Sequence, residues 1–124
     1  MIKEINLFFF SKIPDNIAKG IIITNCYEEK KDKEYVRNIQ SIFNKNGNET
    51  FFIRLEADKD LLLNRVENED RKKTTKIQDR EVLKKILKED DYTTNIIENK
   101  RNLVINNSNI NVTEVVEEIC NFIK

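Results

Sequence analysis

Residues 51–73, FFIRLEADKDLLLNRVENEDRKK, are the stretch that decides the fold of this 124-residue chain. Its opening apolar run, over residues 50–57, predicts a buried strand. Asp58 follows where the N-cap of a helix is expected. Apolar residues then recur on the inward side of that helix: Leu61, Leu62 and Val66. A strand, an acidic turn and a helix in this order favour an α/β protein with a mainly parallel sheet.

The alternation of helix and strand patterns continues on both sides of this stretch. We expect helices over residues 2–13, 33–45, 80–88 and 111–123, and strands over 20–25 and 103–106. Residues 28–33 and 90–100 are charged or polar and predict loops, and residues 70–79 predict a basic, lid-like loop. The terminal helix should bury Val112, Val115, Val116, Ile119 and Phe122. No repeat or linker interrupts the pattern, so residues 1–124 form one domain.

The order of elements predicts a short sheet of about three parallel strands, flanked by helices that provide right-handed crossovers. The run GIIITN, at residues 20–25, is continuous and β-branched, as is typical of a strand buried on both faces. A sheet of three strands leaves a face or an edge without cover. Dimerisation through an uncovered sheet face would be one way to bury it.

The composition excludes several classes of function. The 22 basic and 22 acidic residues balance, which gives no electrostatic case for binding nucleic acid or a membrane surface. Histidine is absent, so Ser-His-Asp or Cys-His catalysis and His-ligated zinc are excluded. Neither a secretory signal nor a membrane-spanning run is evident. Cys26 and Cys120 are expected to be small buried residues in a reducing compartment, which favours a cytoplasmic protein.

Several segments in order resemble the C-terminal portion of shikimate-kinase-like P-loop kinases, and small bacterial AAA-type ATPases with kinase-like sequences most of all. The segments are KGIIIT at 19–24, the helix around Tyr35-Val36, FFIRLEAD, LLLNRVENEDR, and VINNSN followed by a TEVV helix. The resemblance covers most of residues 18–124. It implies a three-layer P-loop NTPase-like fold in which a lid closes over ATP and Mg²⁺.

The resemblance also implies roles for individual residues. Arg65, late on the helix after the strand, takes the place of an arginine that lies against the adenine ring. Arg71, in the lid, takes the place of an arginine that reaches the phosphates. The backbone of Asn107, Ser108 and Asn109 would hold the adenine. A planar guanidinium suits both tasks because it stacks on a base and pairs with phosphate oxygens.

The departures from this family concern the catalytic parts. The P-loop motif G-x-x-x-x-G-K-[ST] is missing from the 124 residues, and the two glycines, Gly20 and Gly47, are not part of one. Thr24-Asn25 stands where many P-loop enzymes carry a Walker B aspartate. Phosphoryl transfer depends on positioning and charge neutralisation, so we expect no catalysis by this chain alone. The pattern predicts a domain truncated at its N-terminus.

Each candidate residue also has a structural interpretation. Arg65 could pair with Glu69 on the same helix face. The basic loop (Arg71, Lys72, Lys73, Lys76) could simply be solvated, since Glu67, Glu69 and Asp70 neutralise it. Asp58 and Asp60 could ligate a metal, but helix capping and the helix dipole also explain them. Phe8, Phe9 and Phe10 cannot all point one way, so they pack between layers or meet a partner.

Three functions remain open. One is a degenerate P-loop-kinase-like domain without catalysis that keeps weak nucleotide or protein binding. Another is an ATP-dependent small-molecule or nucleotide kinase completed by an upstream segment or a partner chain. The third is a structural module that oligomerises through the sheet or through residues 8–10.

Overall fold

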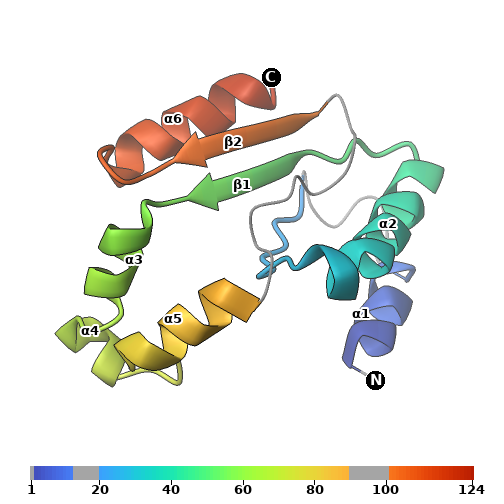
Figure 1. Ribbon diagram of the computed structural model, residues 1–124. Helices are drawn as coiled ribbons and strands as arrows, with labels where there is room; N and C mark the ends of the chain where they lie inside the picture. Colours follow the sequence, from blue (N-terminus) through green and yellow to red (C-terminus); the bar gives the residue numbers. More distant parts are fainter. Residues whose placement is uncertain (1, 13–19, 90–100) are drawn as a thin grey trace.

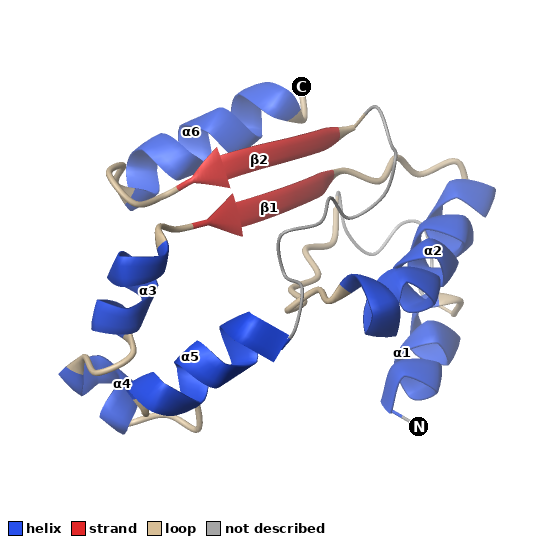
Figure 2. Cartoon of the chain, in the orientation of Figure 1, coloured by secondary structure: helices blue, strands red, loops and turns tan. Residues whose placement is uncertain are grey.

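The computed structural model describes residues 2–12, 20–89 and 101–124. The described helices are α1 (Ile2–Phe10), α2 (Glu29–Lys45), α3 (Lys59–Arg65), α4 (Glu69–Lys72), α5 (Arg80–Glu89) and α6 (Val112–Phe122). The described strands are β1 (Phe52–Glu56) and β2 (Asn102–Asn106), as Figures 1 and 2 show. The α/β class is confirmed. The expected loop at residues 90–100 lies outside the described residues.

The two strands pair in parallel, and α6 covers one face of the sheet (Figure 1). Phe52 is aligned with Asn102 and Glu56 with Asn106. The Phe51 ring, just before β1, packs edge-on against Phe122 of α6 with centroids 5.8 Å apart. Side chains alternate between the faces of a strand, so Phe51, Ile53 and Leu55 lie on the α6 side. Ile105 of β2 is only 2% exposed and anchors this layer.

The predicted third strand is wrong for the described part of the chain. Residues 20–25 adopt neither helix nor strand, and the side chain of Ile22 is 93% exposed. A β-branched run becomes a strand only when a neighbouring strand supplies hydrogen bonds and cover. Among the described residues the sheet has two strands, and neither pairs with this run. The Thr24-Asn25 position is likewise an exposed loop.

The start of α2 differs from the expected charged loop at residues 28–33. The helix begins at Glu29, and both Glu28 and Asp32 are buried. The Glu28 carboxylate accepts a hydrogen bond from the Lys31 amide at 2.9 Å, while Asp32 accepts one from the Glu28 amide at 2.9 Å. This reciprocal capping satisfies amides that a helix start leaves open. Burial of Asp32 is possible because Lys3 of α1 forms an ion pair with it.

Helix α1 packs along α2 (Figure 1). Asn6 donates to the Tyr35 hydroxyl at 3.4 Å, and the Phe10 and Phe43 rings lie 5.8 Å apart. Of the expected partner surface, Phe10 is therefore half-buried against α2, whereas Phe8 is 68% exposed. Phe9 belongs to α1, but its side chain is not among those that the structure describes. The packing interpretation applies to Phe10, and a role in partner binding stays a prediction for Phe8.

Among the residues that the structure describes, the buried apolar side chains are Val36, Ile39, Leu63, Val66 and Ile105. Val66 was expected among them, whereas Leu61 and Leu62 are only half-buried and Leu63 takes the inward position. The expected burial of Val112, Val116, Cys26 and Cys120 is wrong, because all four are exposed. The other residues expected to be buried on α6, namely Val115, Ile119 and Phe122, are half-buried, and Phe122 contacts the sheet through Phe51. No described helix is long and apolar enough to cross a membrane.

Candidate functional site

The carboxyl ends of β1 and β2 lie at the same end of the sheet, where the chain continues into α3 and α6 (Figure 2). Ligands of open α/β sheets bind in the crevice outside the carboxyl ends of the strands. Arg65 ends the helix that follows β1, and Asn107, Ser108 and Asn109 form the turn that follows β2. The carboxyl ends of the two strands, with these residues, are the candidate site.

Arg65 is held by the turn after β2. Its Nη1 donates to the side-chain oxygen of Asn107 at 3.3 Å, and its Nη2 donates to the Asn107 carbonyl oxygen at 3.4 Å. These residues are 42 positions apart in the sequence. Two bonds to one residue restrain the plane of the half-buried guanidinium. The structure thus brings together two residues that the family resemblance places on the same base.

The two connections are also tied to each other by hydrogen bonds of amide groups, one hydroxyl and one carboxylate. The Asp58 amide donates to the Ser108 hydroxyl at 2.7 Å, and the Ser108 amide donates to the Asn106 side-chain oxygen at 2.9 Å. The Asn106 amide group in turn donates to the Asp58 carboxylate at 3.1 Å. Asp58, Asn106 and Ser108, the turn lock, therefore fix the β1–α3 turn against the β2–α6 turn.

The turn lock changes the interpretation of Asp58. Helix α3 does begin directly after Asp58, as expected, but the Asp58 side chain makes no capping bond. Its carboxylate serves the turn lock instead. Asn106 was not singled out from the sequence. The polar run that ends the second strand, Asn106 to Asn109, was the signal that could have found it.

Asn109 is exposed and lies two residues before the N-cap of α6. Asn111 and Glu114 form a capping box there, with Asn111 accepting from the Glu114 amide at 3.0 Å and Glu114 accepting from the Asn111 amide at 2.7 Å. This capping fills the helix start with protein oxygens and places a carboxylate beside it. An anion is therefore disfavoured at α6, and a neutral base edge fits this turn better than a phosphate does.

Arg71 stands apart from the other predicted residues. It lies on α4, and its Nη1 donates to the Ile77 carbonyl oxygen at 3.2 Å, while Thr74 donates to the Arg71 carbonyl oxygen at 2.8 Å. The expected lid at 70–79 is thus a short helix followed by a turn that Arg71 closes. No described hydrogen bond joins Arg71 to Arg65 or to the turn after β2.

The alternative interpretations of the acidic residues are also resolved in part. Glu69 forms an ion pair with Lys72, while Arg65 bonds to Asn107. Within residues 2–12, 20–89 and 101–124, no group of three metal-ligating His, Cys, Asp or Glu side chains comes together. Asp58 belongs to the turn lock. The candidate site is therefore built from amides, a hydroxyl, a guanidinium and the Asp58 carboxylate that Asn106 holds.

Among the described residues, the groups with perturbed pKa values are Glu4 on α1, whose pKa is lowered, and Tyr27 and Asp32 at the start of α2. Burial opposes ionisation of Asp32, but hydrogen bonds from Lys3 and the Glu28 amide, with the charges of Lys3 and Lys31, outweigh it and lower the pKa of Asp32. Burial, together with the Glu29 and Asp32 charges, raises the pKa of Tyr27. Both shifts have structural causes: the ion pair and hydrogen bond with Lys3 account mainly for the lowered pKa of Asp32, and burial accounts mainly for the raised pKa of Tyr27.

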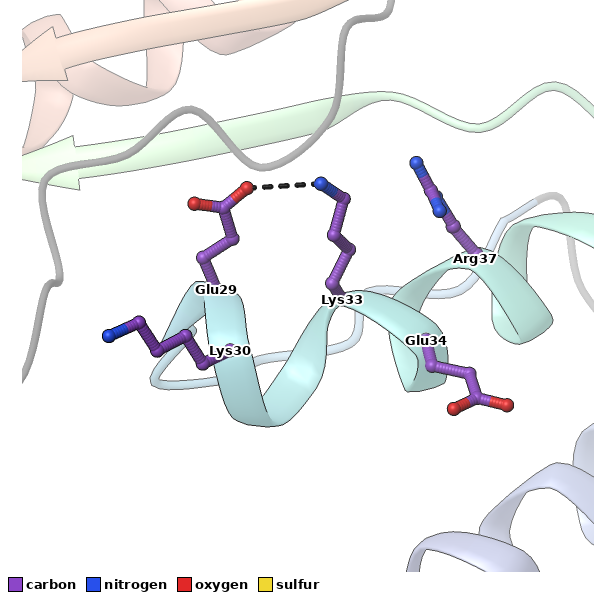
Figure 3. Close-up of a pocket in the computed structure, with 5 residues that line it drawn as sticks. All are labelled: Glu29, Lys30, Lys33, Glu34 and Arg37. Atoms are coloured by element: carbon purple, nitrogen blue, oxygen red, sulfur yellow. Dashed lines mark hydrogen bonds and ion pairs between the residues drawn. The ribbon is translucent and has the colours of Figure 1, made fainter.

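A second feature is an open pocket of ≈ 450 Å³ along the first turns of α2. Figure 3 shows its five lining residues, Glu29, Lys30, Lys33, Glu34 and Arg37. Glu29, Lys33 and Arg37 extend from the same side of the helix, and Lys33 is paired with Glu29 at 3.1 Å. All five belong to one helix and carry charges of both signs. The pocket thus offers a solvated charged surface without convergent polar groups from several elements.

No protein-family model matches the chain, and no curated protein or solved structure matches it. The kinase-like relationship is therefore a hypothesis that rests on the residues themselves. The contact between Arg65 and Asn107 is the structural observation on which a function can be argued.

Proposed function

We propose that this chain is a degenerate P-loop-kinase-like domain that binds a nucleotide weakly at the carboxyl ends of β1 and β2 and does not catalyse phosphoryl transfer. In this proposal, Arg65 stacks on the adenine ring, and the backbone of Asn107, Ser108 and Asn109 holds the base edge. The Asn107 and Ser108 amides already donate to the Glu56 carbonyl oxygen and the Asn106 side chain, so the base edge would meet mainly the Asn109 amide and the carbonyl oxygens of this turn. The three-layer arrangement of that family, with helices on both faces of a parallel sheet, belongs to this proposal.

One observation carries the proposal: Arg65 donates two hydrogen bonds to Asn107, at 3.3 and 3.4 Å, across 42 residues of sequence. A preorganised guanidinium loses less freedom on stacking than a free one, which favours binding. The turn lock adds to this by fixing the turn that carries the expected base contacts.

The weak affinity and the lack of catalysis follow from the phosphate side. Within the 124 residues there is no P-loop to hold the β- and γ-phosphates. Arg71, the expected phosphate contact, is engaged with the Ile77 carbonyl oxygen. Binding would then depend on the base alone, and a dissociation constant near 1 mM corresponds to about −4 kcal/mol.

The test is a titration of the full chain with ATP, with and without Mg²⁺, and with adenosine, followed by calorimetry and by NMR chemical shifts. Adenosine and ATP should bind about equally, with or without Mg²⁺, and shift the amides of Asn107 to Asn109. Arg65→Ala should weaken binding about tenfold, which corresponds to a base–arginine contact of roughly 1.4 kcal/mol.

The matched control is Arg71→Ala, which should leave adenosine binding unchanged. ATP that binds far more tightly with Mg²⁺ than adenosine does would contradict the proposal, because it would require a phosphate site. So would the absence of any shift at several millimolar nucleotide. That second result would favour the interaction-module function, for which the exposed Ile22, Val112 and Phe8 side chains argue.

A further inference from the structure

Strand β1 has a free edge in the part of the chain that the structure describes. Its hydrogen bonds toward β2 involve the Phe52 amide, which donates to Arg101 at 3.0 Å, and the Glu56 carbonyl oxygen, which accepts from Asn107 at 2.8 Å. The backbone groups of successive strand residues point to opposite sides. Those of Ile53 and Leu55 therefore point away from β2, to an edge that can accept another strand.

Leu55 marks the centre of this edge. It lies on the α6 side of the sheet, yet its side chain is 53% exposed, whereas its partner in β2, Ile105, is 2% exposed. Helix α6 therefore covers the β2 part of this face of the sheet and leaves Leu55 of β1 exposed. An exposed apolar residue in the middle of a free strand is an interaction site unless charges protect it.

The charges beside Leu55 have opposite signs. Arg54 and Glu56 flank it and form an ion pair on the other face of the sheet. When two copies of β1 run antiparallel with Leu55 opposite Leu55, Arg54 of each copy lies opposite Glu56 of the other. Opposite charges directly across a strand pair stabilise it. The strand is therefore complementary to itself in charge.

The backbone agrees with this register. Leu55 would face Leu55 of the second copy as a hydrogen-bonded pair, because its amide and carbonyl point to the free edge. Arg54 and Glu56 would form the closer, non-hydrogen-bonded pairs on either side, where side chains interact most strongly. A register centred on Arg54 or on Glu56 instead sets like charges opposite each other, which is destabilising.

We propose that β1 pairs antiparallel with β1 of a second copy of this chain, about a two-fold axis at Leu55, to make a continuous sheet in the order β2-β1-β1-β2. Residues 20–25, the other β-branched segment of the chain, carry no charge that could answer Arg54 and Glu56. A second copy of β1 supplies both charges. The interface leaves the carboxyl ends of the strands open, so it does not depend on nucleotide binding.

The test is sedimentation velocity of the full chain across a concentration series, with two charge variants. Wild type should shift from monomer to dimer as concentration rises. Glu56→Arg makes both positions basic and Arg54→Glu makes both acidic. Each should raise the dimer dissociation constant about tenfold or more, since two attractive cross-strand pairs become repulsive. An equimolar mixture should restore association, because every Arg then faces a Glu.

Two further variants keep the proposal falsifiable if a charge variant fails to fold by circular dichroism. Leu55→Pro removes an amide that points to the free edge and spares the bonds to β2, so it should abolish the dimer. Val112→Ser, at an exposed residue of α6, is the matched control and should dimerise as wild type does. Arg65→Ala should also dimerise normally.

Three results would overturn the proposal. Wild type that stays monomeric at the highest concentration would do so. A folded charge variant that dimerises as wild type does, or a folded pair whose mixture does not associate, would do so too. The third result is a dimer that Ile22→Lys abolishes and the charge variants do not affect. It would mean that residues 20–25, and not a second copy of β1, pair with the free edge of β1.

Discussion

The sheet unit, formed by β1, β2 and α6, and the α1–α2 pair are held together by different interactions. The sheet unit relies on a parallel backbone ladder, on the buried Ile105 and on the largely neutral hydrogen bonds of the turn lock. The helix pair relies on the ion pair between Lys3 and the buried Asp32, and on the contact between Phe10 and Phe43. Apolar burial is indifferent to pH near neutrality, whereas an ionised buried carboxylate is not.

The sheet unit and the α1–α2 pair should therefore be sensitive to different kinds of substitution. A lost methylene group should harm the sheet unit most, and a lost charge should harm the helix pair most. The candidate nucleotide site sits in the sheet unit, so it should tolerate acid better than the α1–α2 packing does. Four substitutions test this contrast, beginning with a buried side chain of the sheet unit.

Ile105→Ala should break the sheet unit. The side chain is 2% exposed between the strands and α6, and truncation of a buried isoleucine costs about 2–5 kcal/mol of unfolding free energy. Urea unfolding at pH 7 measures it. The matched control is Val104→Ala on the same strand, where the side chain is exposed and the expected loss is below about 1 kcal/mol. Equal losses at both positions would refute the burial assigned to Ile105.

Asp32→Asn should weaken the helix pair by about 1–3 kcal/mol at pH 7, because it removes a charge-assisted hydrogen bond from Lys3. The pKa of Asp32 is lower in the folded chain than in the unfolded one. The stability it contributes is therefore complete above the unfolded pKa, roughly 3.9, and is lost as the pH falls through the lower folded pKa.

The measurement is urea unfolding of both proteins at neutral pH and at successively lower pH. Wild type should lose more stability on acidification than Asp32→Asn does, so the two curves should converge in acid. Parallel curves would show that Asp32 is not the group whose protonation matters.

Ser108→Ala should loosen the turn lock. It removes the acceptor of the Asp58 amide, and the loss of one such hydrogen bond costs about 0.5–1.5 kcal/mol. Hydrogen exchange at the Asp58 amide should accelerate, which NMR can follow directly. Asn109→Ala, one residue further on and exposed, should leave that exchange rate unchanged. If both variants exchange alike, Ser108 does not tie the two turns together.

Lys33→Ala should have the smallest effect. Its ion pair with Glu29, at 3.1 Å on the surface of α2, is solvent-screened, and such i,i+4 pairs contribute about 0.3–0.5 kcal/mol. High salt should abolish even this difference between variant and wild type. A loss above about 1 kcal/mol would show that the charged surface along α2 has a structural or binding role that its geometry does not suggest.

Much of the local structure could be predicted from the sequence. Apolar periodicity indicated α2, α5 and α6, and the β-rich runs indicated β1 and β2. Asp79, of a residue type that favours the N-cap position, directly precedes α5 and accepts hydrogen bonds from the Glu81 and Val82 amides at 2.8 and 3.0 Å. These features depend on interactions over a few residues, which is why a local pattern reveals them.

Other features needed partners that lie far away in the sequence. Residues 20–25 have the composition of a strand, but a strand forms only beside another strand. Glu28 and Asp32 look like surface charges until Lys3, 29 residues from Asp32, neutralises the latter. Asp58 is predicted to be a helix cap, but its carboxylate instead accepts a hydrogen bond from Asn106, 48 residues away. The sequence around each of these residues does not indicate its distant partner.

The sequence by itself therefore determined the α/β class, the positions of both described strands, and the residue types available at the strand ends. The absence of histidine and of a P-loop motif from the 124 residues also follows from the sequence alone. The three-dimensional packing set which polar side chains became partners: Arg65 with Asn107, Asn106 with Asp58, Lys3 with Asp32. The physical reason is that backbone conformation responds to near neighbours, whereas burial and pairing depend on which distant elements meet.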